Sequence, residues 1–342
     1  GTQNTLIGGL AGDAITTGGD NVAVGFASLS STTTATNNSA VGTYALNVNT
    51  TGGSNVAMGY NALGANTTAS NNTAIGTSAL TLNTTGTRMT SVGARSGMQN
   101  TTGNYNAFFG YDAGESNTTG ASNTFIGDSA GRETTTASNN TAVGQAALLA
   151  NTTGTQNTAL GEGALGANTT ASYNTALGEN ALASNTTGTQ NVAVGQATLD
   201  TNTTGDNNTA VGRDALTANT TADNNTAVGK AALTANTTGA NNTAVGYQSL
   251  LDNTTGFSLA AFGWGSLANN TTGTDNAALG VSTLGANTTG ANNTAVGNYS
   301  LDANTTAANN TAVGYASLGA NTTGASNVAV GQGALQANTT AS

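Results

Sequence analysis

Two glutamates in this sequence have the residue type and spacing that could support catalysis. Glu162 and Glu179 are 17 residues apart, and paired carboxylates about 5 Å apart can serve as acid and nucleophile in a glycosidase. Histidine and cysteine are both absent, which removes most nucleophile, base and zinc constellations. We therefore predict no catalytic residue, no metal site and no cofactor, and we interpret the two glutamates as solvated surface acids.

Large aromatic residues recur at multiples of the same 17-residue interval: Tyr60, Tyr111, Tyr247, Trp264 and Tyr315. Many residue types occur at this place in the repeat, which indicates that it faces solvent. Exposed aromatic rings with a polar edge suit contact with sugars, so these five are candidate glycan contacts, with Tyr247 and Trp264 as the best pair. The simpler interpretation is an aromatic pair that stiffens the surface or contacts another subunit.

The tripeptide Asn-Thr-Thr is present in seventeen repeats, for example at Asn151, Asn236 and Asn321. It is an acceptor sequence for N-glycosylation, so these asparagines are candidate glycosylation sites. Asn and Thr also favour turns, and identical side chains stack into ladders in repeated β-structure. We favour this second interpretation.

All of these residues belong to one 17-residue unit, present in twenty copies without insertion or deletion. With Asn242–Ser258 numbered as positions 1 to 17, position 4 is always apolar, position 5 is always glycine, and positions 13 and 14 are always threonine. Position 9 is leucine in sixteen copies and glycine in four. Because a repeat array is one quasi-linear object, residues 1–342 are predicted to form a single continuous array.

The unit is too short for two packed helices, and its turn-forming residues leave room only for short extended segments. Stacked units would pair each segment with its copy in the next coil, about 4.8 Å away. The sequence therefore predicts an all-β fold: a parallel β-solenoid, or β-roll, of twenty 17-residue coils without helices. The glycine at position 5 is expected to have a backbone conformation that other residues adopt only at a cost.

Positions 3 and 9 change together. Where position 9 is glycine, position 3 departs from its usual alanine, giving the pairs Leu6 with Gly12, Ser91 with Gly97, Phe108 with Gly114 and Phe125 with Gly131. Three of these four exchanges conserve volume, as a tightly packed layer requires. We infer that positions 3 and 9 share one buried layer, with Met89 or Met98 filling the space beside Ser91.

Position 4 follows position 3 directly, so in a strand it points to the opposite face. The apolar columns at positions 4 and 9 are both predicted to be buried. A 17-residue coil has little chain left to cover a second face, so another copy of the protein is the simplest cover. The sequence therefore predicts a homo-oligomer, and we expect a homotrimer.

Composition argues against two kinds of partner. Five basic and fifteen acidic residues give a net charge of −10, whereas nucleic-acid binding needs a stripe of Lys and Arg. No run of 18 apolar residues is present, so no membrane span is expected. Charged residues are only 6% and proline is absent, which does not fit a disordered segment.

The element Asn-Thr-Ala-Val-Gly, as in residues 242–246, resembles the Ser-Val-Ala-Ile-Gly element in the head repeats of trimeric autotransporter adhesins of the YadA type. The whole unit is also similar to repeats of bacterial surface proteins and phage tail fibres. The resemblance implies a left-handed parallel β-roll, assembled as a trimer in a surface fibre. The chain departs from the adhesin heads in unit length, because their coils are shorter.

We therefore expect a structural shaft or adhesive segment of an extracellular fibre, on a cell surface or a virion, that gives length, stiffness and multivalent display. The alternatives are a phage tail-fibre shaft that binds host surface glycans and an ice-binding solenoid, which would need two outward threonine columns. Gly1 falls at position 15 and Ser342 at position 16, and both end coils look like interior ones. The chain is thus expected to be a slice of a longer fibre or to stack head to tail.

Overall fold

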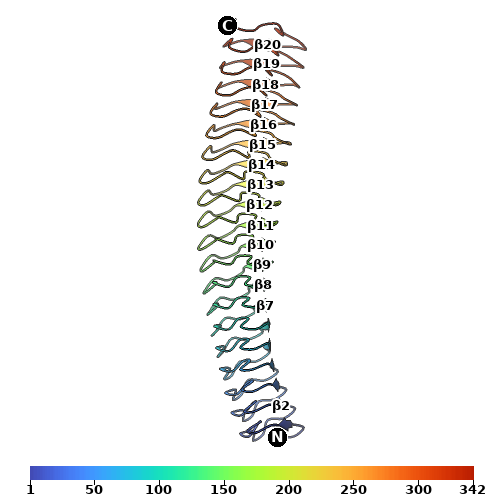
Figure 1. The fold of residues 1–342 in the computed structure, drawn as a ribbon, viewed down its shortest axis with the longest axis vertical. Coiled ribbons are helices and arrows are strands. Elements are labelled where there is room, and N and C mark those ends of the chain that lie inside the picture. Colours follow the sequence, from blue (N-terminus) through green and yellow to red (C-terminus); the bar gives the residue numbers. More distant parts are fainter. The chain divides into compact units, whose positions relative to one another are not determined.

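The computed structural model describes all 342 residues as an all-β chain with twenty three-residue strands and no helix (Figure 1). Two compact units divide the chain, residues 1–173 and residues 174–342. The strands of the first unit are β1 (Thr5–Ile7), β2 (Val22–Val24), β3 (Ser39–Val41), β4 (Val56–Met58), β5 (Thr73–Ile75), β6 (Thr90–Val92), β7 (Ala107–Phe109), β8 (Thr124–Ile126), β9 (Thr141–Val143) and β10 (Thr158–Leu160). Those of the second are β11 (Thr175–Leu177), β12 (Val192–Val194), β13 (Thr209–Val211), β14 (Thr226–Val228), β15 (Thr243–Val245), β16 (Ala260–Phe262), β17 (Ala277–Leu279), β18 (Thr294–Val296), β19 (Thr311–Val313) and β20 (Val328–Val330).

Within each unit, neighbouring strands pair in parallel, in the register that the repeat dictates. In β14 and β15, for example, Ala227 lies opposite Ala244 and Val228 opposite Val245. Each repeat position therefore forms a column along its unit. The predicted parallel β-solenoid with a 17-residue coil is confirmed.

The glycine at position 5 follows each strand and has a backbone conformation that suits no other residue. Its φ lies between 121° and 143° in all twenty copies. A Cβ on Gly229 would lie 2.5 Å from the carbonyl oxygen of Gly246 in the next coil. The position is thus restricted by its φ and by contact between successive backbones, as the sequence predicts.

One interior layer is built from positions 3 and 9, as their paired exchanges predict. Leucine at position 9 is buried in the interior coils, and so is alanine at position 3. A Cβ on Gly131 would come within 2.6 Å of the Phe125 ring, and one on Gly114 within 2.8 Å of the Phe108 ring. The large side chain at position 3 thus occupies the space that leucine leaves. At Gly97 the nearest side chains are Phe108 and Leu80. Met89 is also buried, and the expectation that a methionine fills the space beside Ser91 stays a prediction.

Asparagine ladders form the polar part of the interior. At position 1, the Asn242 backbone N–H donates to Asn225 Oδ1 (3.0 Å), and Asn242 Nδ2 donates to the Gly256 carbonyl (2.9 Å). At position 12, Asn253 Nδ2 donates to Asn236 Oδ1 (2.9 Å) and to the same Gly256 carbonyl (3.0 Å). These contacts satisfy polar groups that would otherwise be costly to bury.

The column at position 4 lies on the outside of the coil. The prediction that positions 4 and 9 are both buried is right for position 9 and wrong for position 4 in the single chain, where Leu279 is 50% exposed and Phe262 39% exposed. The cause is strand alternation: with position 3 in the interior, positions 2 and 4 must point outward. The outer face of the sheet is therefore an apolar column without cover.

Candidate functional site

The five aromatic residues predicted as glycan contacts, Tyr60, Tyr111, Tyr247, Trp264 and Tyr315, are all exposed. Four of their rings have a neighbour. Tyr60 packs against Tyr44 (ring centroids 6.1 Å apart), and Tyr315 packs against Tyr299 (5.9 Å). Arg95 lies over the Tyr111 ring at 5.3 Å from its centroid, and Lys230 lies over the Tyr247 ring at 6.0 Å. Trp264 has no aromatic or cationic partner. Tyr247 and Trp264 therefore do not form a ring pair, and the Trp264 ring is free to contact a ligand.

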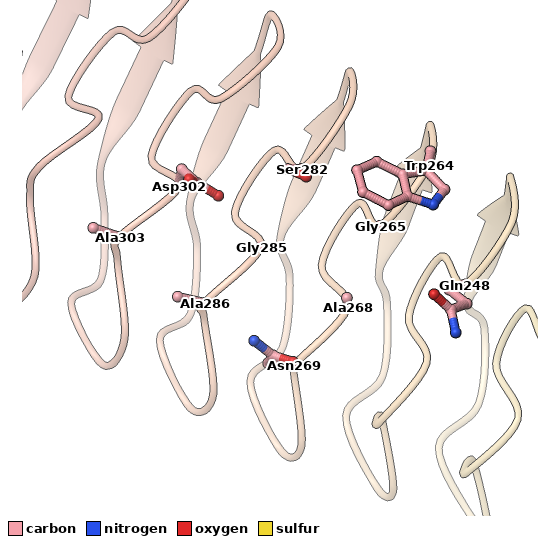
Figure 2. A pocket seen from close by; sticks show the side chains of 10 residues that line it. All are labelled: Gln248, Trp264, Gly265, Ala268, Asn269, Ser282, Gly285, Ala286, Asp302 and Ala303. Atoms are coloured by element: carbon pink, nitrogen blue, oxygen red, sulfur yellow. The ribbon is translucent and has the colours of Figure 1, made fainter.

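Trp264 forms one wall of a shallow depression of about 410 Å³ (Figure 2). The indole extends from its own coil toward the next coil, which carries Ser282. Gln248, Asn269 and Asp302 contribute polar side chains, none of which has a hydrogen bond within the chain, and small residues line much of the remainder. The depression combines a free aromatic surface with unused hydrogen-bonding groups.

Asp302 links this depression to a second one. It also lines a hollow of about 370 Å³ together with Tyr299, Tyr315 and Gln336. Partial burial raises the pKa of the Asp302 carboxyl above its usual value, because a low-polarity environment disfavours the charged form. No basic residue lines either depression, so Asp302 is the one charged group in both.

A charged cluster in the first unit was not anticipated from the sequence. Arg95 Nε donates to Asp112 Oδ1 (2.7 Å) across neighbouring coils, and Arg95 Nη2 lies 3.5 Å from Glu115 Oε1. Its hydrogen bond to Asp112 raises the pKa of Arg95. The available signal was the occurrence of Arg95 and Asp112 at position 7 of consecutive repeats. We interpret the cluster as a structural contact that stabilises the packing of neighbouring coils.

The two glutamates considered as a catalytic pair lie on the surface. Glu162 and Glu179 are both exposed and belong to different units, and Glu179 Oε2 accepts a hydrogen bond from Gln196 Nε2 (3.1 Å). No group of three His, Cys, Asp or Glu residues that could hold a metal ion is present.

The candidate glycosylation sites lie in the interior. Asn151, Asn236 and Asn321 are fully buried, and their Nδ2 atoms donate to the carbonyls of Gly154 (3.0 Å), Gly239 (3.0 Å) and Gly324 (2.9 Å). A sugar on Nδ2 would replace one of its two N–H groups and has no space in the folded coil, because these side chains are fully buried. The placement favours the ladder interpretation over modification.

The two adjacent threonine columns differ. At position 13, Thr254 is half-buried and its Oγ1 donates to the Thr271 carbonyl (3.0 Å). At position 14, Thr255 is exposed. Of these two columns only one faces outward, whereas an ice-binding face would need two.

An apolar depression of about 260 Å³ lies on the outer face of the sheet. Phe262, Leu279 and Val296 at position 4 line it, together with alanines of the same strands. Position 2 is alanine rather than threonine at residues 260 and 277, which opens the space. This depression is part of the uncovered column at position 4.

Fold and repeat together define a tandem-repeat parallel β-solenoid. No family model matches the chain, and no curated protein matches it either. The structure also has no helix with the length and apolar character needed to cross a membrane.

Proposed function

We propose that this chain is a structural shaft or adhesive segment of an extracellular fibre, on a cell surface or a virion. The observation that carries the proposal is an apolar outer column at position 4 in a solenoid of near-identical coils. Such a chain supplies length and stiffness, and its unused face suits lateral association with copies of itself.

Stiffness has a structural basis in the contacts between coils. Each interior coil is joined to the next by strand pairing and by side-chain ladders. For example, Asn253 Nδ2 donates a hydrogen bond to Asn236 of the preceding coil, and Thr254 Oγ1 donates one to the Thr271 carbonyl of the following coil. Bending a unit would strain several such columns at once. A rod of this kind holds whatever it displays at regular intervals.

Charge patterning supports a second copy as the cover for the outer sheet face. In twenty repeats, positions 2 and 4 never carry a charged residue, whereas position 6 carries Asp128, Glu162, Glu179, Arg213 and Lys230. Identical faces without charge can meet without repulsion, and apolar surface gains from leaving water. We propose a homotrimer built on this face, wound left-handed as the resemblance to adhesin heads implies, with head-to-tail stacking as a further mode of association.

Antibody labelling tests where the fibre is located. Antibodies raised against residues 1–342 are expected to decorate filaments outside intact source cells, or the fibres of virions, in electron micrographs. A preimmune serum is the control for background. Gold particles confined to the cell interior after sectioning, with intact surfaces bare, would contradict the proposal.

A further inference from the structure

We propose that the surface between Trp264 and Gln336 binds a neutral oligosaccharide that lies along the solenoid axis. We call this surface the aromatic groove: the two depressions that share Asp302, bounded by Gln248 and Gln336. The inference rests on the proposed function, because it names the class of ligand that the adhesive fibre would bind.

Trp264 is the stacking platform of the groove. Its side chain is 52% exposed and has no aromatic or cationic neighbour, so one face of the indole is free to receive a sugar ring. Gly265, Ala268 and Gly285 lie beside it and leave space above the backbone where larger side chains would stand. Figure 2 shows the indole beside these small residues. An aromatic wall over a floor of small residues fits the flat apolar face of a pyranose.

The polar side chains of the groove match hydroxyl groups. Gln248 and Asn269 can each donate and accept hydrogen bonds, and the Asp302 carboxylate can accept several. None has a hydrogen bond within the chain, and Asp302 is partly desolvated. A carboxylate in this state gains from hydroxyl donors, since hydrogen bonds to a charged acceptor are the stronger kind.

The groove is long enough for more than one sugar. Gln248 and Gln336 lie in the first and last of six consecutive coils, which corresponds to about 24 Å at the spacing of paired strands. Tyr299, in the same coil as Asp302, and Tyr315, in the next coil, form an edge-to-face pair with an interplanar angle of 83°. They provide aromatic surface beside and beyond Asp302. Aromatic, carboxylate and aromatic groups thus follow one another along the axis.

Charge selects the class of sugar. With Asp302 as the one charged group and no lysine or arginine in the lining, a sulfated, phosphorylated or sialylated chain would be repelled. The depression at Phe262 and Leu279, by contrast, has only apolar side chains and offers nothing to a hydroxyl. It lies on the strand residues, whereas the aromatic groove lies on the segments after the strands, so self-association and sugar binding use different surfaces.

Tryptophan fluorescence tests the proposal directly, because Trp264 is the single tryptophan of the chain. The full chain is titrated with neutral hexasaccharides of glucose, mannose and N-acetylglucosamine and with heparin hexasaccharide. At least one neutral hexasaccharide is expected to change the Trp264 emission saturably, and Asp302→Ala is expected to weaken its Kd at least tenfold. Tyr173→Ala, which removes an exposed tyrosine of the other unit that is not a candidate glycan contact, should leave the Kd unchanged.

Isothermal titration of Trp264→Ala provides an independent readout, with its far-UV dichroism confirming the fold. Loss of measurable heat with the neutral hexasaccharide supports the groove, and unchanged binding overturns it. The proposal is also overturned if none of the three neutral hexasaccharides gives a saturable change up to about 10 mM, a Kd range that represents negligible affinity, or if heparin alone binds. Fibres labelled outside the cell that bind no sugar would overturn this inference and leave the proposed fibre function intact.

Discussion

Replacing Gly229 by alanine is expected to lower the free energy of unfolding by at least about 3 kcal/mol. The φ of Gly229 is 134°, a region that residues with a side chain rarely occupy. The new Cβ would also lie 2.5 Å from the Gly246 carbonyl oxygen and 2.7 Å from its carbon. Moving either coil away from the other would disrupt the pairing of β14 with β15. Urea denaturation followed by far-UV dichroism measures the loss.

Gly265→Ala is the matched control. Gly265 also has a positive φ, 62°, but a Cβ there would meet only Ser282 Oγ at 3.7 Å. The left-handed conformation alone costs an alanine about 1 kcal/mol. A difference between the two variants therefore measures what the more restrictive φ of Gly229 and the backbone contact between coils cost together. Equal losses would contradict the restriction assigned to Gly229.

Replacing Asn242 by aspartate is expected to destabilise the protein by about 3 kcal/mol or more at pH 7. Asn242 is fully buried, and its Nδ2 donates to the Gly256 carbonyl (2.9 Å). Aspartate would replace this donor with a carboxylate oxygen facing a carbonyl oxygen. The exchange adds one buried charge and leaves the Gly256 carbonyl without that donor. Thermal unfolding at several pH values measures the effect.

The sign of the pH dependence follows from burial. Desolvation and the facing carbonyl would raise the folded-state pKa of the new aspartate above its unfolded value of about 3.9. The penalty is thus full above the folded pKa and decreases as the pH falls through it, because the protonated acid is neutral and can donate to Gly256. Asn241→Asp, at the exposed neighbouring position, should change stability by less than about 0.5 kcal/mol. An Asn242→Asp penalty that persists at pH 3 would contradict the ladder account.

The repeat length, the parallel pairing and the interior layer could all be predicted, because identical coils constrain each other. A glycine present in every copy indicated a backbone restriction at Gly229, and the exchange of Leu for Gly at position 9 identified Phe125 as its spatial complement. Twenty copies in one chain provided the comparison that one coil could not.

Other features depend on conformations that residue types do not indicate. Leucine at position 9, such as Leu250 with a φ of 52°, has the left-handed conformation that normally favours glycine. Burial of its side chain offsets that cost. Asparagine at positions 1 and 12 suggested turns and ladders, but not that the ladders lie inside. Asn242 and Asn236 are buried, because a narrow coil needs donors for the carbonyls that face its interior. The exposure of position 4 follows once position 3 is known to be inside.

The candidate sugar site was only partly predictable. Exposure of Trp264 followed from the variability of its position, but the partner predicted for it, Tyr247, lies instead beneath Lys230. Asp302 is 38 residues from Trp264 in the sequence. It reaches the same depression because position 10 of one coil lies near position 6 of a coil two repeats earlier, a relation that depends on how each coil folds back after its strand.

The mass of the purified chain in solution is the most direct test of the central claim, that uncovered apolar columns join copies of this solenoid into a fibre. Multi-angle light scattering is expected to give three times the 33.0 kDa of one chain, or the mass of a larger assembly. The double variant Phe262→Glu, Leu279→Glu should shift this mass downward. Gln196→Glu, at a position where Glu162 and Glu179 are native, should not. A monodisperse species of 33.0 kDa at every concentration would contradict the account.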